Sequence, residues 1–181
     1  MNRYQRAVLV LNLAEELRKN KSWCGETHLQ KAVYFLQELM QVPLGYEFIM
    51  YKHGPFSFDF RDELFSFMAD GLIEYEIQNP YGPKLKPTAN YDELKKTYPK
   101  TIGAYIAKIK WIAEKLGNKG VVDLEKLGTA LYVERNAKKE GKETREFAEE
   151  IIKLKKHLTI EEAMDALKEV KEMEAAIPQP N

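Results

Sequence analysis

The stretch that organises this sequence, residues 50–60, reads MYKHGPFSFDF. A Gly-Pro pair interrupts a run of bulky side chains, and a charged, aromatic segment begins at Ser57. Proline fixes its own φ and disfavours a helical residue before it, whereas glycine reaches backbone angles that other residues avoid. Gly54-Pro55 therefore predicts an architectural turn rather than a catalytic loop. Ser57 is the expected N-cap of a helix that runs to about Asp70.

Two helices and a short strand are expected before this turn. Residues 3–18 are apolar at helical spacing, with one face formed by Tyr4, Ala7, Leu11 and Ala14 and widened by Val10, Leu13 and Leu17. A second helix is expected from Thr27 to about Met40, because Thr27 and Gln30 fit a capping box. Residues 46–51, YEFIMY, are aromatic and β-branched and predict a short strand.

The segment after the turn completes a recognisable order of elements. Gly71 is a plausible C-cap, residues 72–77 alternate apolar and acidic side chains, and KLKPT reads as a returning strand. Residues 3–88 therefore predict helix, helix, short strand, helix and hairpin, the plan of a winged helix. The fold class expected is mainly α with a small β-hairpin, a winged-helix-like three-helix core plus a C-terminal helical extension.

The rest of the chain predicts mostly helix. Residues 102–116 carry an isoleucine-rich stripe that we expect to pack on the N-terminal body, because it is too continuous to leave in water. Thr159 and Glu162 fit another capping box. The expected division is a winged-helix-like domain over residues 1–140 and a helical extension over 141–181 that packs on it.

Composition bounds the class of protein. The 181 residues include 28 Lys plus Arg and 28 Asp plus Glu, so the formal net charge is zero, which argues against a strongly DNA-coating or membrane-coating protein. The single cysteine excludes an intrachain disulfide and a cysteine-built zinc site, and fits a reducing cytoplasm. No apolar run approaches the ~18 residues that a membrane span needs.

The helix expected at residues 57–70 favours protein binding over DNA binding. A winged helix reads DNA with its third helix, which needs cations for the phosphates. The charged residues here are Arg61 against Asp59, Asp62, Glu63 and Asp70. On the expected wing, Lys84 and Lys86 are offset by two glutamates, so nucleic acid binding through the wing is the weaker alternative.

The same helix carries a wide apolar stripe with two interpretations. Phe58, Phe65 and Met68 share one face, and Phe60, Leu64 and Phe67 share its neighbour. In the first, which we favour, the C-terminal helices cover this stripe; in the second, part of it is an exposed patch that docks another protein. In the second case we expect the acidic residues to form its rim and to favour a basic partner.

Catalytic and metal-binding interpretations have little support. Cys24 and His28 are four residues apart, but Gly25 and an expected helix start lie between them, so a buried thiol is the better interpretation than a nucleophilic dyad. His53 with Asp59 and Asp62 offers metal ligands without a ligand-spacing pattern. We therefore predict no enzyme activity, no metal and no cofactor.

The residues also resemble a known family. LQKAVYFLQEL, YKHGPFSFDFRDEL and GLIEYE look like the Panacea domain, the SocA-like or phage-associated antitoxin family, and are similar to YwgA-like proteins. The matching residues are Leu29, Gln30, Lys31, Tyr34, His53, Gly54, Pro55 and Ser57. LEKLGTALYV, residues 124–133, also resembles a helix of such proteins. His53 departs from the family's tyrosine. The resemblance implies a helical, winged-helix-like domain that acts by protein binding, as an antitoxin or a proteolytic adaptor.

These observations predict a cytoplasmic, non-catalytic protein-binding regulator, antitoxin-like or adaptor. The expected partner is another protein, a toxin or a protease substrate, with no membrane involved, and a homodimer is left open. A winged-helix transcriptional regulator is the alternative, and a small-molecule or metal-dependent enzyme is third. The expected partner-binding residues are His53, Phe56, Phe58, Asp59, Arg61, Asp62 and Glu63.

Overall fold

The computed structural model describes residues 1–78, 81–137 and 144–178, and these ranges are mainly helical with two small antiparallel hairpins. The predicted fold class, mainly α with a small β-hairpin, is confirmed. The elements are α1 (Arg3–Lys19), α2 (Glu26–Glu38), β1 (Ile49–Tyr51), β2 (Gly54–Phe56), α3 (Phe58–Ala69), β3 (Ile73–Gln78), β4 (Tyr81–Pro87), α4 (Ala89–Thr97), α5 (Pro99–Leu116), α6 (Val121–Ala137), α7 (Thr144–Leu154) and α8 (Ile160–Ala175). None of the described helices is long and apolar enough to span a membrane.

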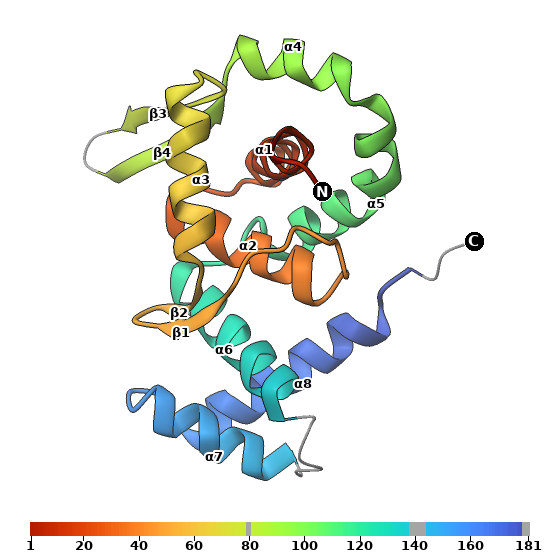
Figure 1. Cartoon of the computed structure of the whole chain (residues 1–181). Coiled ribbons are helices and arrows are strands. Elements are labelled where there is room, and N and C mark those ends of the chain that lie inside the picture. Colours follow the sequence, from red (N-terminus) through yellow and green to blue (C-terminus); the bar gives the residue numbers. More distant parts are fainter. Residues whose placement is uncertain (79–80, 138–143, 179–181) are drawn as a thin grey trace.

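Helix α1 is the centre of the N-terminal body. Figure 1 looks along α1 and shows α2, α3, α4 and α5 around it. Val8 and Leu9 are completely buried, whereas Tyr4 is 45% exposed. The predicted single face, with Tyr4 on it, is therefore wrong, because neighbours surround the middle of this helix and bury its residues on all sides. Asn2 and Gln5 form a capping box that starts the helix.

Helix α5 packs against α1 and α2, as its isoleucine stripe predicts. Ile109, Ile112 and Leu116 are completely buried, while Ile106 is half-buried at the edge of the contact. Lys108 Nζ donates a hydrogen bond of 2.8 Å to the Met40 carbonyl and ties α5 to the end of the α2 segment.

Helix α2 begins without the predicted capping box. Its N-cap is Gly25, which offers no side-chain hydrogen bond, and Thr27 lies inside the helix. The Gln30 side chain does not reach back to the start of the helix; it hydrogen-bonds to the backbone of Ser57. The prediction fails because a distant part of the chain takes the side chain that the local pattern assigned to a cap.

The expected strand before the turn forms a hairpin of its own. β1 pairs with β2, with Tyr51 opposite Gly54, so the turn consists of Lys52 and His53. Gly54 and Pro55 are thus the first residues of β2, and the prediction that they form the turn is wrong, because the turn lies at the two residues before them. Ser57 then caps α3, accepting a hydrogen bond of 3.1 Å from the Phe60 N–H, as expected.

The second hairpin follows α3 in the predicted order. Ile73 pairs with Pro87 and Glu74 with Lys86. β4 is fixed to the loop between α1 and α2, because the Leu85 N–H donates to the Cys24 carbonyl at 2.8 Å. The order of elements over residues 3–88 is as predicted, with β2 added. The winged-helix interpretation of the core stays a prediction.

Helix α6 connects the N-terminal body to the last two helices. It contacts α2 and β2 on one side and α7 and α8 on the other (Figure 1). The predicted capping box at the start of α8 is confirmed by hydrogen bonds in both directions between Thr159 and Glu162. The predicted division at residue 140 lies outside the described residues.

Candidate partner-binding surface

The Leu29-Gln30-Lys31 segment of α2 positions the first hairpin. Leu29 is buried in the core. Gln30 Nε2 donates to the Ser57 carbonyl at 3.0 Å and Gln30 Oε1 accepts from the Ser57 N–H at 3.1 Å. Lys31 Nζ donates to the Pro55 carbonyl at 2.7 Å. These three bonds fix the path of the chain from β2 into α3.

Gly54 and Gly128 let the hairpin lie directly on α2 and α6. Gly54 has φ +85°, and a Cβ there would lie 3.3 Å from Lys31 Cε and 3.5 Å from Thr129 Oγ1. A Cβ on Gly128 of α6 would lie 3.1 Å from Pro55 Cδ. Both glycines therefore sit where a Cβ would make a tight contact, and Gly54 also has a left-handed backbone angle.

Tyr34, on α2, is buried and packs edge-on against Phe48 at 4.9 Å between ring centroids.

The Lys31 ammonium is buried beneath this hairpin. Burial lowers its pKa to about 8, although the nearby Glu125 carboxylate opposes the shift and Lys155 adds to it. The Pro55 carbonyl is its hydrogen-bond acceptor. A buried ammonium bonded to a backbone carbonyl is a structural tie.

Glu125 of α6 and Lys155, just after α7, form a buried ion pair at 2.9 Å. Lys155 Nζ also donates to the Tyr51 carbonyl at 3.1 Å and to the Lys52 carbonyl at 2.6 Å. Burial alone would raise the pKa of Glu125, but Lys155 and the neighbouring histidines hold it below its ordinary value. The pair therefore joins the β1–β2 hairpin to the C-terminal helices.

Two histidines lie at the outer edge of this ion pair. His53 Nδ1 is 3.5 Å and His157 Nε2 is 3.8 Å from the Glu125 carboxylate. Their side chains are 57% and 61% exposed. His53 thus occupies the turn of the hairpin at the surface.

A cluster of three aromatic rings covers the outside of the hairpin and the start of α3. The Phe58 ring lies 5.5 Å from Tyr51 and 5.1 Å from Phe56, and Tyr51 lies 5.6 Å from Phe56, between centroids. Tyr51 is 53% and Phe58 is 39% exposed, while Phe56 is half-buried. Phe65, two turns further along α3, is 45% exposed.

The apolar stripe of α3 is divided between core and surface. Phe60, Leu64 and Phe67 are completely buried. Phe60 packs on Tyr46 at 5.1 Å, so the N-terminal body covers this side. Phe58 remains exposed, and the expectation that the C-terminal helices cover the whole stripe is wrong. The helix spacing of α3 placed the two faces correctly but could not say which face is covered.

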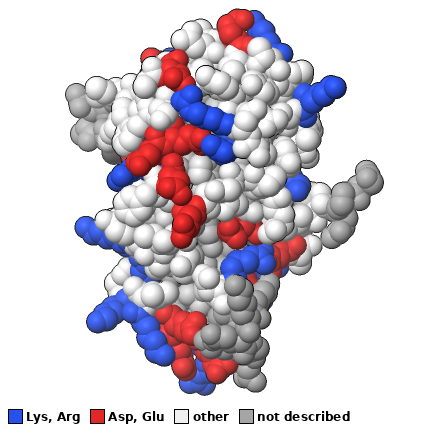
Figure 2. All heavy atoms as spheres, viewed as in Figure 1, with Lys and Arg blue, Asp and Glu red and all other residues white. Residues whose placement is uncertain are grey.

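The carboxylates of α3 follow the same division. Asp59 and Asp62 are exposed beside the aromatic rings. Glu63 instead accepts hydrogen bonds from Arg6 and from Tyr46, and is part of the contact between α1 and α3. Figure 2 shows acidic side chains gathered in a band over α3. Of these carboxylates, Asp59 and Asp62 are exposed to solvent.

We call the group formed by Tyr51, Phe56, Phe58, Phe65, Asp59 and Asp62 the aromatic–acidic surface.

The lysines of the second hairpin are engaged with their own surroundings. Lys84 Nζ lies 4.1 Å from the centroid of the Trp23 ring, a cation–π contact. Lys86 lies 3.8 Å from the Glu74 carboxylate on the paired strand. On the same hairpin, Glu76 pairs with Arg18 at 2.8 Å. This hairpin is therefore charge-balanced rather than basic.

Cys24 and His28 do not form a reactive pair. Cys24 is completely buried, and burial raises the pKa of its thiol to about 12. His28 Nδ1 lies 3.0 Å from Ser22 Oγ, and burial lowers the pKa of His28 to about 4. Among the described residues, no group of three or more His, Cys, Asp and Glu is placed to hold a metal ion, so His53, Asp59 and Asp62 do not converge.

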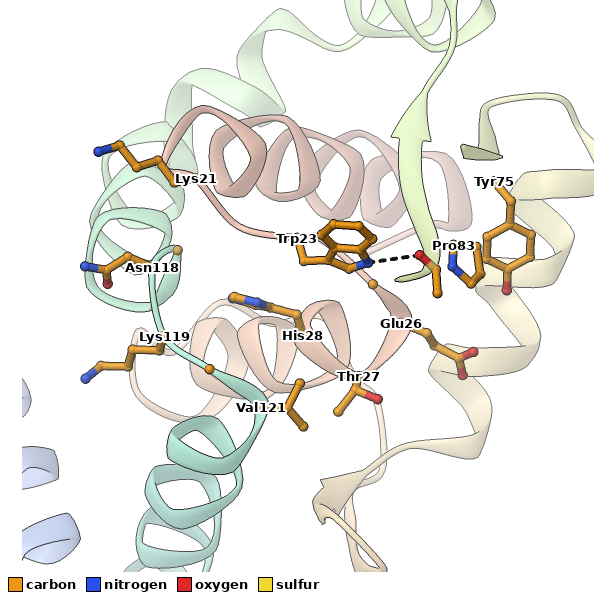
Figure 3. A pocket seen from close by; sticks show the side chains of 14 residues that line it. Lys21, Trp23, Glu26, Thr27, His28, Tyr75, Pro83, Asn118, Lys119 and Val121 are labelled. Carbon is orange, nitrogen blue, oxygen red and sulfur yellow. Dashed lines mark hydrogen bonds between the residues drawn. The ribbon is translucent and has the colours of Figure 1, made fainter. Parts of the chain in front are cut away.

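A groove of about 560 Å³ opens between α2, the second hairpin and the start of α6 (Figure 3). Its volume is in the range of small-ligand sites. Two of its polar groups are already engaged: the Trp23 indole N–H donates to the Gly82 carbonyl at 3.1 Å, and Lys119 pairs with Glu169 at 2.6 Å. The lining points to no particular ligand chemistry.

The sequence did not reveal Glu125 and Lys155, which hold the hairpin from the C-terminal side. Each lies in an ordinary helical pattern, where a charge predicts a solvated face. Gly128 is the signal that was available, because a glycine inside a helical pattern often marks a close backbone approach. It lies one turn after Glu125 and contacts Pro55.

Searches against protein-family models and against curated proteins found no match to this chain. The resemblance to Panacea and YwgA-like proteins therefore rests on the motif residues themselves and stays a prediction.

Proposed function

We propose that this chain is a non-catalytic protein-binding regulator, antitoxin-like or adaptor, that recognises its partner through the aromatic–acidic surface. The observation that carries the proposal is the cluster of Tyr51, Phe56 and Phe58 at the surface, beside the exposed carboxylates of Asp59 and Asp62. Exposed aromatic side chains in one patch are the residues that most often anchor protein interfaces.

The cluster is also held in place, which favours a binding role. The Tyr51 carbonyl accepts a hydrogen bond from Lys155 Nζ. Phe58 directly follows Ser57, whose backbone is held by two hydrogen bonds from the Gln30 side chain. A surface that is ordered before binding loses less conformational entropy when the partner arrives. The rings therefore form a ready anchor rather than a loose apolar segment.

Charge selects the kind of partner. Asp59 and Asp62 repel phosphate and attract a basic segment, which they steer toward the rings. The only cation in the first two turns of α3 is Arg61, and Lys84 and Lys86 of the second hairpin are paired with their own neighbours. We expect a basic, partly apolar protein segment as the partner and only non-specific affinity for DNA.

Photo-cross-linking in the native cell tests this proposal. A benzophenone amino acid placed at Tyr51, Phe58 or Phe65 should cross-link the same protein, identified by mass spectrometry. Tyr4 and Val122 are the matched controls, because they are 45% and 61% exposed and lie outside the aromatic–acidic surface. They should not capture that protein.

The charge-reversed variant Asp59→Lys/Asp62→Lys should lose the cross-link from Phe58 while its melting temperature is unchanged. Cross-links that are no more frequent at the three surface positions than at the controls would contradict the proposal. So would a nucleic acid, rather than a protein, as the species captured.

A further inference from the structure

Arg61 makes a contact within the chain that shows which cation chemistry the aromatic–acidic surface accepts. Its guanidinium carbon lies 5.0 Å from the centroid of the Phe58 ring. The guanidinium also donates to Asp62 Oδ1, from Nε at 3.3 Å and from Nη2 at 3.2 Å. An aromatic face with a carboxylate beside it suits a guanidinium, which stacks and hydrogen-bonds at once.

The contact is weak. The side chains of Arg61 and Asp62 are 37% and 69% exposed, and exposed ion pairs contribute little to stability. Neighbouring residues on a helix do not face each other, which is a poor arrangement for an ion pair. The hydrogen bonds are longer than the roughly 2.7–2.9 Å of strong charge-assisted bonds. Another guanidinium can therefore take over the same groups.

Resting on the proposed function, we infer that the partner segment delivers an arginine side chain to Phe58 and Asp62, and that Arg61 is an internal competitor for this position. The Tyr51 and Phe56 rings, 5.5 and 5.1 Å from Phe58, contact the apolar neighbours of that arginine. Lysine fits less well, because its ammonium is a compact charge. A planar guanidinium can stack on the ring and hydrogen-bond to the carboxylate at the same time.

NMR titration of the full ¹⁵N-labelled chain with the tripeptide acetyl-Leu-Arg-Leu-amide tests the inference. Saturable shifts are expected at the backbone amides of Phe58, Arg61 and Asp62. The matched tripeptide with citrulline, which keeps the shape and removes the charge, should bind about two- to fivefold more weakly, the strength of an exposed cation–π contact. The lysine tripeptide should lie between them.

The decisive variant is Arg61→Ala, which should bind the arginine tripeptide about two- to fivefold more tightly than wild type, because the competitor is gone. Arg3→Ala is the matched control: it removes the same charge, but Arg3 pairs with Asp70 at the far end of α3. Its affinity should equal that of wild type. Phe58→Leu keeps an apolar side chain and should abolish the preference for arginine over citrulline.

Equal binding of the arginine and citrulline tripeptides, or weaker or unchanged binding by Arg61→Ala, would overturn the inference. Its failure differs from failure of the proposed function. Partner cross-links from Tyr51, Phe58 and Phe65 that persist without an arginine preference would leave the proposed function standing. An arginine preference without any partner cross-link would remove the proposed function and leave the arginine site.

Discussion

At the scale of single residues, Gly54 and Lys31 show how the hairpin is seated. Gly54 has a positive φ and no room for a large side chain. Lys31 is buried, and its ammonium donates a hydrogen bond to the carbonyl of Pro55, the residue after Gly54. The conformational freedom of one and the charge of the other serve the same contact. The sequence predicted a turn at Gly54-Pro55, but the turn lies at Lys52 and His53. Gly54 has the left-handed angle of +85° that a glycine allows, at the first position of β2.

Gly54→Ala should lower the free energy of unfolding by about 1–3 kcal/mol, because alanine is strained at positive φ and its Cβ approaches Lys31 and Thr129. Gly45→Ala is the matched control, since Gly45 has φ +80° with nothing within 4 Å of a Cβ. It measures the backbone strain alone. Urea denaturation that gave equal losses for both variants would show that the hairpin does not pack as tightly as described.

Lys31 predicts a pH dependence of stability. Its pKa of about 8 when folded lies below the ~10.4 of an unfolded chain, so between these values the unfolded state holds a proton that the folded state has lost. The stability of wild type relative to Lys31→Met should therefore be constant below pH 8 and rise up to about pH 10. Urea denaturation at several pH values measures this difference, and a flat or falling difference would argue against the burial of Lys31.

At the scale of elements, helix α5 and the β1–β2 hairpin show how far sequence patterns reach. The stripe of α5 was predicted because its apolar residues recur at helical spacing, and the burial of Ile109 and Ile112 confirms it. The pairing of β1 with β2 was missed because β2 consists of Gly54, Pro55 and Phe56, which carry no strand pattern. Its position depends on contacts with α2 and α6 that no local signal encodes.

The stripe of α5 predicts graded losses of stability. Ile109→Ala should cost about 2–5 kcal/mol, because the side chain is completely buried and the substitution leaves a cavity. Ile106→Ala, one turn earlier and half-buried, should cost less than about 2 kcal/mol. Thermal or chemical unfolding of both variants tests the grading. Equal losses of unfolding free energy would mean that α5 turns a different face to α1 and α2.

At the scale of the whole molecule, the Glu125–Lys155 pair connects the β1–β2 hairpin to the C-terminal helices. Lys155 comes from the C-terminal helices and bonds to Tyr51 and Lys52, so the surface formed by residues 51–62 depends on a residue about a hundred positions away. The sequence predicted the acidic and aromatic members of this surface. It could not predict which of them are exposed, because α1 covers Glu63 and leaves Asp59 and Asp62 open.

Lys155→Met should destabilise the chain by about 3 kcal/mol, because it leaves the buried Glu125 carboxylate without its cation. Its neighbour Lys156 is exposed, and Lys156→Met should stay within about 0.5 kcal/mol of wild type. Hydrogen exchange should also quicken in residues 49–56 of the Lys155 variant alone. Equal behaviour of the two variants would show that the hairpin does not depend on this pair.

The measurement that tests the central claim most directly is a binding titration of wild type and Asp59→Lys/Asp62→Lys against the cross-linked partner and, in parallel, against a short DNA duplex. We predict that the charge-reversed variant binds the partner at least about tenfold more weakly. We also predict that wild type binds DNA no more tightly than about 10⁻⁶ to 10⁻⁴ M at physiological salt. A nanomolar, sequence-specific complex of wild type with the duplex, lost in Arg61→Ala, would contradict the account.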